Sequence, residues 1–112
     1  MKMNTKNTPL VSVVMINYNG SSDTIECVNS LSKATYQNLQ IIVVDNASTD
    51  NSLAILRDQL HFDNLTIIAS KENNGFSAGN NIGIRQAQQS GSDFVLILNN
   101  DTIVEPGFIE PL

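Results

Sequence analysis

The sequence predicts an α/β fold built on an open, mostly parallel sheet with helices on both faces. Four short runs are almost continuously apolar and rich in β-branched residues, and helix-like stretches separate them. Such runs are typical of strands buried on both sides, as in a parallel sheet covered by helices. The chain has 112 residues, 41% of them apolar, which is enough for one domain with its own core. The expected order is β-α-β-α-β-α-β with right-handed crossovers.

The predicted strands follow a polar tail. We expect residues 1–8 to be a disordered polar tail and residues 9–112 to form a single domain. The strands are predicted at residues 11–16, 41–44, 65–69 and 94–98. The second run has the strongest strand preference, because it consists of four consecutive β-branched residues.

Three helices are predicted between the strands. Asp23 with Glu26 reads as a capping box at the start of the first helix. Asp50 is expected to cap the second, and Ser77 to begin a third that reaches about Ser90 and stops at Gly91. The third helix also contains Gly79 and Gly83, which lower helix stability and therefore indicate close packing against a neighbour or a ligand.

Composition excludes several classes of protein. Six basic against eleven acidic residues give a net charge of −5, whereas nucleic-acid binding needs a cationic face, so we expect no nucleic-acid partner. The single Cys27 excludes a disulfide framework and is expected to pack in the first helix, while His61 is expected in a solvated loop. No apolar run approaches 18 residues. These features are typical of a soluble, cytoplasmic domain.

Every predicted strand ends in a cluster of amide and carboxylate side chains. Carboxyl ends of parallel strands meet at one edge of the sheet, and ligands bind there, near the point where strand order reverses. Each cluster alone is typical of a turn, but four at one edge indicate a shared site. The clusters are Asn17-Tyr18-Asn19-Gly20, Asp45-Asn46-Ala47-Ser48-Thr49-Asp50, Lys71-Glu72-Asn73-Asn74-Gly75-Phe76 and Asn99-Asn100-Asp101-Thr102.

The missing motifs narrow the chemistry. The loop at residues 17–22 is neither a G-x-G-x-x-G turn nor a P-loop, so a diphosphate would lack a backbone cradle at the first helix. An acidic site repels phosphate unless a divalent cation intervenes, and Mg²⁺ or Mn²⁺ accepts carboxylate and phosphate oxygens together. Asp45 and Asp101 are the candidates for holding a cation or for hydrogen-bonding a base or ribose. The residues alone therefore suggest metal-assisted nucleotide-diphosphate binding as a hypothesis.

Four motifs in order resemble the amino-terminal half of family 2 glycosyltransferases, which have the Rossmann-like GT-A fold. The resemblance covers about residues 9–112. It implies binding of a nucleotide-sugar donor and transfer of the sugar to an acceptor hydroxyl with inversion at the anomeric centre, as in polysaccharide biosynthesis. The motifs lie at residues 11–19, 42–50, 73–83 and 98–101.

The resemblance also implies roles for individual residues. Asn17, Tyr18 and Asn19 would lie along the nucleobase and ribose. Asp45 and Asn46 match the pair that meets the base. The donor pocket would further be lined by Asn73, Gly75 and Asn100, and Asp101 matches the last Asp of a D-x-D-type motif, which ligates Mg²⁺ or Mn²⁺.

Two positions depart from the commoner family pattern. Asn46 replaces an Asp, which leaves the base open among uracil, thymine and guanine, with UDP- or dTDP-sugars as the expected donors. Asn100 replaces an Asp and lowers the negative charge beside Asp101. The Asn-Asn-Asp and Asn-Gly-Phe sequences are similar to a rhamnosyltransferase-like branch, so hexosyl and rhamnosyl transfer both remain open.

Inverting transfer needs a general base that deprotonates the acceptor hydroxyl, and in the family this Asp lies well after the D-x-D region. We expect it beyond Leu112, because Glu105 and Glu110 come too soon and are expected to start another helix near Pro106. The chain is therefore interpreted as a truncated donor-binding half that is inactive alone. The expected acceptor is a glycan or a lipid-linked molecule, with the longer protein peripheral at the inner face of the membrane. An exposed sheet edge suggests a homodimer.

The alternative is a non-catalytic nucleotide-binding or receiver-like regulatory α/β module. A receiver uses strand-end carboxylates for Mg²⁺, a phospho-accepting Asp and a Lys after a late strand. In this sequence the acids are not paired after the first strand, and Lys71 is the only Lys that follows a strand. Both features favour the glycosyltransferase interpretation.

Overall fold

A four-stranded parallel sheet forms the centre of the molecule. The computed structural model describes residues 8–112, so the prediction of a disordered tail falls almost entirely outside the described residues. All pairings are parallel and the strand order is β3-β2-β1-β4. The strands are β1 Val11–Asn17, β2 Leu39–Asp45, β3 Leu65–Ala69 and β4 Phe94–Ile97.

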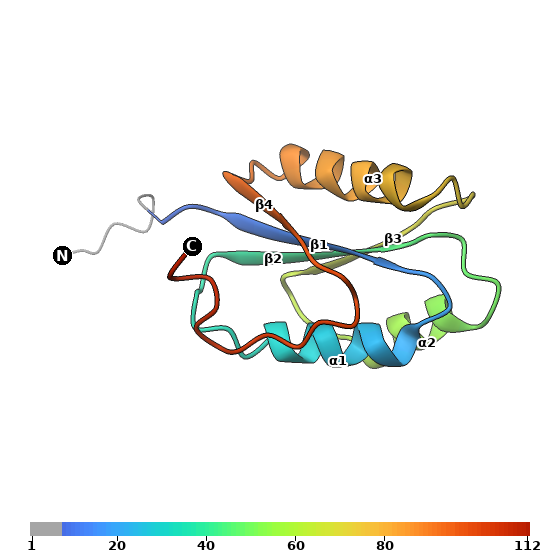
Figure 1. Ribbon diagram of the computed structural model, residues 1–112, viewed down its shortest axis with the longest axis horizontal. Coiled ribbons are helices and arrows are strands. Elements are labelled where there is room, and N and C mark those ends of the chain that lie inside the picture. The colour runs from blue at the N-terminus through green and yellow to red at the C-terminus, as the bar shows by residue number, and fades with distance from the viewer. Residues whose placement is uncertain (1–7) are drawn as a thin grey trace.

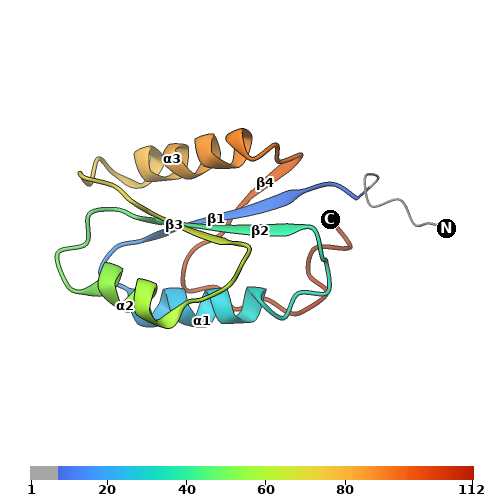
Figure 2. The same cartoon turned by 180° about the vertical axis from the view of Figure 1, so that it is seen from behind.

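Helices cover both faces of this sheet, as the sequence predicts. Two helices lie on one face and the third lies on the other, which Figures 1 and 2 show from opposite sides. This arrangement follows from right-handed crossovers when the chain reverses its direction along the sheet. The helices are α1 Ser21–Leu31, α2 Ser52–Gln59 and α3 Phe76–Gln89.

The strand order reverses beside β1. The chain runs outward from β1 to β2 and β3, then returns through α3 to β4 on the other side of β1. Val14 of β1 therefore pairs with Ile42 on one side and with Ile97 on the other. In open parallel sheets, ligands bind outside the carboxyl ends of the strands near such a reversal, so a binding crevice is expected beside the carboxyl ends of β1 and β4.

Apolar side chains pack in two layers, one on each face of the sheet. Val13 and Met15 point towards α1 and α2, where they join Val28, Leu31 and others. Val14 and Ile16 point the other way, into a smaller cluster beneath α3. Every residue of β1 is buried, which explains why its sequence is continuously apolar rather than alternating.

The glycines of α3 allow the helix to lie very close to the sheet, as predicted. A Cβ atom at Gly79 would approach the Cδ1 of Ile16 to 2.4 Å, and one at Gly83 would approach Cγ1 of Val14 to 2.3 Å. Real Cβ atoms do not reach such distances. The contact of α3 with β1 therefore requires glycine at these two positions.

The helix starts differ from the predicted ones. α1 begins at Ser21 rather than Asp23, because the carbonyl of Gly20 already accepts the first intrahelical bond, from Thr24 N–H at 3.1 Å. The predicted capping box is therefore wrong: no side chain caps α1, and Asp23 lies in its first turn. α2 begins at Ser52, and Asp50 accepts a 2.8 Å bond from Ser52 N–H from just outside the helix.

The end of α3 agrees with the prediction. It stops at Gln89, and Gly91 has φ of 79°, the left-handed conformation that ends many helices.

The helix expected near Pro106 does not form. Residues 105–112 make turns, because this segment folds back against the end of α1 and the loop that follows it. Thr35 N–H donates to Pro106 O at 2.8 Å, its hydroxyl donates to Glu110, and Ile109 is buried against the core. Among the described residues, no helix is long and apolar enough to cross a membrane.

Candidate functional site

Buried hydrogen bonds join the carboxyl ends of β1 and β2 to the loop after β4. Asn17 donates from Nδ2 to Oδ1 of Asp45 at 2.9 Å and accepts at Oδ1 from the Thr24 hydroxyl at 2.6 Å. The Thr24 hydroxyl accepts in turn from Nδ2 of Asn100 at 3.0 Å. Asn17 and Thr24 are fully buried. Hydrogen bonds in such a low-dielectric place are costly to leave unmade, so the network fixes these segments relative to one another.

Asp45 receives hydrogen bonds at both carboxylate oxygens. Ser48 donates from its hydroxyl to Oδ1 at 2.6 Å and from its backbone N–H to Oδ2 at 3.2 Å. The carboxylate is 2% exposed and yet lines a pocket of about 540 Å³ together with Arg57 and Lys71. Asp50 lines it as well, so two acidic and two basic residues face the same hollow at the ends of β2 and β3.

Asn19 joins the first loop to the loop after β2. Its Oδ1 accepts from the backbone N–H groups of Thr49 and Asp50 at 2.8 and 3.1 Å, and its Nδ2 donates to the Thr49 hydroxyl. Asn19 has a positive φ of 51°, a conformation that Asn tolerates better than most residues. Ala47 also has a positive φ, 59°. Both unusual conformations lie in the loops of the candidate site, where local strain is often found.

Asn46 holds the loop that leads into α3. Its Nδ2 donates to Oδ1 of Asn73 at 3.1 Å and to the carbonyl of Gly75 at 3.2 Å, and Gly75 N–H donates to the same Asn73 oxygen at 3.0 Å. Gly75 has φ of 99°, which strongly favours glycine. We call Asn46, Asn73 and Gly75 the α3 clamp, because together they set where α3 begins.

A second pocket opens at the crevice between β1 and β4. It has a volume of about 300 Å³ and is bounded by the exposed rings of Tyr18 and Phe76 and by Asn100 and Asp101. Nδ2 of Asn100 is committed to Thr24, which leaves its carbonyl oxygen available to a ligand. An acidic group, an amide and two aromatic rings therefore converge where the topology predicts a binding crevice.

The donor set at Asp101 suits a cation that brings further oxygen ligands with it. Within residues 8–112, no group of three or more His, Cys, Asp or Glu side chains could hold a metal ion on its own. Mg²⁺ commonly binds through one or two carboxylates plus substrate phosphates and waters. One exposed carboxylate beside an amide oxygen fits that mode, and does not fit a structural zinc or calcium cage.

Cys27 lies under this pocket but is not a nucleophile. Its side chain is fully buried in α1, as predicted. Burial, together with the negative charge of Asp101, raises the thiol pKa from 9.0 to about 11. The thiol therefore stays protonated at neutral pH, and the thiolate is the reactive form.

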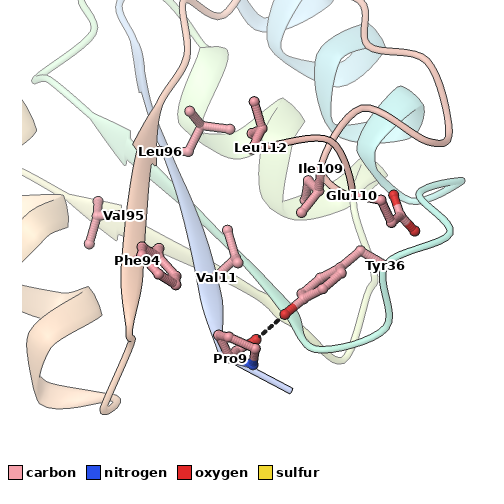
Figure 3. Close-up of a pocket in the computed structure, with 9 residues that line it drawn as sticks. All are labelled: Pro9, Val11, Tyr36, Phe94, Val95, Leu96, Ile109, Glu110 and Leu112. Atoms are coloured by element: carbon pink, nitrogen blue, oxygen red, sulfur yellow. Dashed lines mark hydrogen bonds between the residues drawn. The ribbon is translucent and has the colours of Figure 1, made fainter. Parts of the chain in front are cut away.

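An apolar pocket elsewhere has none of the predicted site residues. Its volume is about 380 Å³, and Figure 3 shows Val11, Phe94, Ile109 and Leu112 around it, with the Tyr36 hydroxyl bonded to the Pro9 carbonyl. It lies where β1 and β4 begin, and so at the opposite end of the strands from the polar side chains. Glu110 also lies there, so the turn at the end of the described chain brings no carboxylate to the crevice.

The structure brings the predicted site residues together but gives them different exposures. Tyr18, Asn19, Asn73, Gly75 and Asp101 are exposed, and Asn100 is half-buried. Asn17, Asp45 and Asn46 are buried. Asn17, expected along the base, uses its side chain to hold Asp45 and Thr24.

Sequence reasoning missed several residues at this edge. Thr24 links β1 to the Asn100 loop, and its signal was a polar residue within the apolar stripe of α1. Arg57, in α2, faces the pocket of Asp45, and no local pattern marks it. Lys71 and Phe76 belong to the polar cluster predicted after β3, but the sequence did not indicate that they line the pockets of Asp45 and Asp101 respectively.

Known proteins are similar to this chain in sequence and in fold. Glycosyltransferase GlyG of Streptococcus pneumoniae is 39% identical over 104 residues, which are 92% of this chain and 34% of that protein. The chain spans about a third of the length of the curated relatives it matches, with shares of 34%, 32% and 30%.

Two solved structures extend the likeness to three dimensions. Mannosyltransferase PcManGT of Pyrobaculum calidifontis, in complex with GDP-Man and Mn²⁺, matches with a TM-score of 0.75 at 28% identity. The match covers 83% of this chain and 28% of the PcManGT chain. TarS of S. aureus in complex with UDP-GlcNAc matches with a TM-score of 0.75 at 28% identity. The match covers 90% of this chain and 29% of the TarS chain. The model of the glycosyl transferase family 2 matches residues 12–112. With this match, the fold and the polar crevice in place, the chain belongs to glycosyl transferase family 2.

Proposed function

We propose that this chain is the donor-binding part of an inverting glycosyltransferase that uses a nucleotide-diphosphate sugar. The observation that carries the proposal is the order of the polar groups along the sheet edge. Asp45 ends β2, Tyr18 follows β1 and Asp101 follows β4, and these strands are neighbours in that order. An extended ligand with a base at one end and a diphosphate at the other matches this sequence of groups.

In this arrangement the base and ribose lie on the side of Asp45. Its pocket supplies a carboxylate as acceptor and the cations Arg57 and Lys71. Asn19 holds the two loops between which the ribose would pass. Asn17 and Asn46 support the site from beneath, through their bonds to Asp45 and to the α3 clamp.

The diphosphate lies on the side of Asp101. Asp101 would hold a Mg²⁺ or Mn²⁺ ion there, with the side-chain carbonyl oxygen of Asn100 as a further ligand. Such an ion would supply positive charge to stabilise the leaving diphosphate. PcManGT, whose complex contains GDP-Man and Mn²⁺, is the related case that supports a metal. The solved relatives carry different donors, GDP-Man and UDP-GlcNAc. That this chain binds a UDP- or dTDP-sugar, or a rhamnosyl donor in particular, therefore stays a prediction.

Donor binding and sugar transfer need different groups. Apart from Asp101, Tyr18 is the only titratable side chain that lines the crevice pocket among the described residues. We therefore propose that the base for the acceptor hydroxyl, from a glycan or a lipid-linked molecule, comes from outside residues 8–112. Residues 1–112 alone would then hold the donor without passing on the sugar.

We also propose that two copies of the chain associate through β4. This strand is an edge of the sheet, and Phe94, Val95 and Ile97 expose apolar side chains there. Unprotected apolar edges favour pairing with another strand. No residue of Phe94–Ile97 carries a charge that would oppose such pairing.

The metal role is tested by measuring nucleotide binding with and without Mn²⁺. UDP, dTDP and GDP are titrated into the 112-residue chain by calorimetry, first with Mn²⁺ and then with EDTA. Asp101→Ala should abolish the Mn²⁺-dependent part of the affinity. The loss should be at least the roughly 10–100-fold typical of a residue that only supports a metal ligand.

Glu105→Ala is the matched control, because Glu105 is an exposed acid that lies four residues further on and does not line the crevice pocket. It should bind as the unaltered chain does. Equal affinity in Mn²⁺ and EDTA, unchanged by Asp101→Ala, would show that the metal role is wrong.

A further inference from the structure

Two aromatic rings are exposed at the polar edge of the sheet. Phe76 is 55% exposed and Tyr18 is 46% exposed, and both line the pocket that contains Asp101. The other large exposed apolar side chains of the described chain belong to β4 and to the residues after it. Phe76 has no polar atom to solvate and is not needed by the core. An exposed phenyl ring that lines a pocket is typical of a ligand-binding surface.

The position of Phe76 is fixed by the α3 clamp. Phe76 is the first residue of α3 and directly follows Gly75. The carbonyl and N–H of Gly75 are bonded to Asn46 and Asn73 respectively, and Gly75 has the left-handed φ of 99°. Asn46 is 4% exposed and follows β2 directly. The backbone that carries the phenyl ring is thus tied to the residue that follows β2, so the ring starts from a fixed point beside the pocket.

The chemistry of the pocket indicates which part of a donor meets this ring. In a nucleotide sugar the diphosphate lies between the nucleoside and the sugar. If the base lies by Asp45 and the diphosphate by Asp101, the sugar is the part that shares the crevice pocket with the diphosphate. One face of a pyranose ring presents mainly C–H groups, and the negative face of an aromatic ring attracts them.

We propose that Phe76 is a specificity-determining residue that packs against the sugar ring of the donor. This inference rests on the proposed function, because it takes the diphosphate to lie at Asp101. Tyr18 lines the same pocket. Phe76 contributes affinity for the sugar and none for the nucleotide, so it separates a donor from its diphosphate product.

The experiment compares each donor with its own nucleotide. Calorimetry in Mn²⁺ measures UDP against UDP-glucose, GDP against GDP-mannose, and dTDP against dTDP-rhamnose, for the unaltered chain and for Phe76→Ala. With the best-binding pair, Phe76→Ala should weaken binding of the nucleotide sugar by roughly 2–12-fold and leave binding of the nucleotide unchanged. Phe76→Tyr, which keeps the aromatic face, should restore the affinity for the nucleotide sugar.

Two controls keep a structural effect apart from a lost contact. Phe94→Ala removes an exposed phenyl ring at the other end of the strands and should leave both affinities unchanged. The thermal midpoint of Phe76→Ala without ligand should equal that of the unaltered chain, because the ring is not part of either core layer.

The outcomes separate this inference from the proposed function. Equal weakening of nucleotide and nucleotide sugar would place the ring against the base or the diphosphate, and no weakening of either would remove it from the donor site. Both results overturn the inference while nucleotide binding stands. Failure of the unaltered chain to bind any nucleotide in Mn²⁺ would instead overturn the proposed function, and the inference with it.

Discussion

Cys27 shows how burial sets the chemistry of a single residue. Its thiol lies near the Asp101 carboxylate, but its raised pKa keeps it protonated at neutral pH, so it is not the reactive thiolate. Its Sγ lies 4.0 Å from the carbonyl oxygen of Asn99, a weak contact. Cys27 is therefore a small apolar residue that packs α1 onto the sheet.

The Cys27 pKa predicts a pH dependence of stability. Its folded-state pKa of about 11 exceeds the ordinary value of 9.0, so the unfolded chain loses this proton first. The thiol's contribution is therefore full below pH 9.0 and is lost as pH rises to about 11. In EDTA, the free energy of unfolding should fall more steeply over that range for the unaltered chain than for Cys27→Ala.

Urea denaturation of the two chains at several pH values measures this difference. Cys27→Ala should itself cost roughly 1–2 kcal/mol at neutral pH, through the cavity it leaves. Parallel pH profiles for the two chains would show that the thiol is not shielded from water.

Helix α3 is the element in which packing most clearly overrides intrinsic preference. Gly83 weakens the helix by about 1 kcal/mol relative to Ala. Glycine is nevertheless needed at this position, because the helix lies directly on Val14. Val14 is fully buried and β-branched, so its side chain has little freedom to move aside.

Gly83→Ala should therefore destabilise the chain even though Ala is the better helix former. The new Cβ would meet Cγ1 of Val14 at 2.3 Å and Cγ2 of Val44 at 3.3 Å, and overpacking of this kind costs about 1–3 kcal/mol. The measurement is urea unfolding, with Gln88→Ala, at an exposed position of the same helix, as the control without effect. Unchanged or higher stability of Gly83→Ala would show that α3 does not lie this close to the sheet.

Predictability differed between strands and loops for a physical reason. Strands such as β1 could be predicted because burial on both faces leaves a continuous apolar run, and the end of α3 because Gly91 is a strong stop signal. The start of α1 was misplaced because Asp23 fits a cap equally well within the first turn, where its charge also suits the helix dipole. Long-range pairs such as Thr24 with Asn100, 76 residues apart, depend on the assembled sheet and have no local signature.

At the scale of the molecule, topology determines where the site lies. Parallel strands bring all the carboxyl ends to one edge, and the reversal of strand order beside β1 opens the crevice next to Asp101. The shared edge could be predicted from the pattern of strands and helices alone, whereas the place of the reversal comes from the strand order, which that pattern does not contain. The same topology leaves β4 at an edge of the sheet.

Among residues 8–112, the side of β4 that faces away from β1 pairs with no other strand. Phe94 and Leu98 donate their N–H groups to Leu10 and Val14, on the side of β1. Backbone groups alternate in direction along a strand, so those of Val95 and Ile97 point away from β1. Antiparallel pairing of two copies about an axis at Leu96 would let Val95 of each bond with Ile97 of the other.

We therefore expect the 112-residue chain to dimerise as its concentration rises, and more so at higher salt, because each copy carries a net charge of −5. Val95→Lys should give a monomer, since a charge on an edge strand opposes pairing. Ala69→Lys, at the exposed end of β3 on the other edge, is the matched control and should still dimerise. Sedimentation equilibrium distinguishes these cases. A chain that stays monomeric at every concentration, or that dimerises equally with Val95→Lys, would show that the β4 edge does not join two copies.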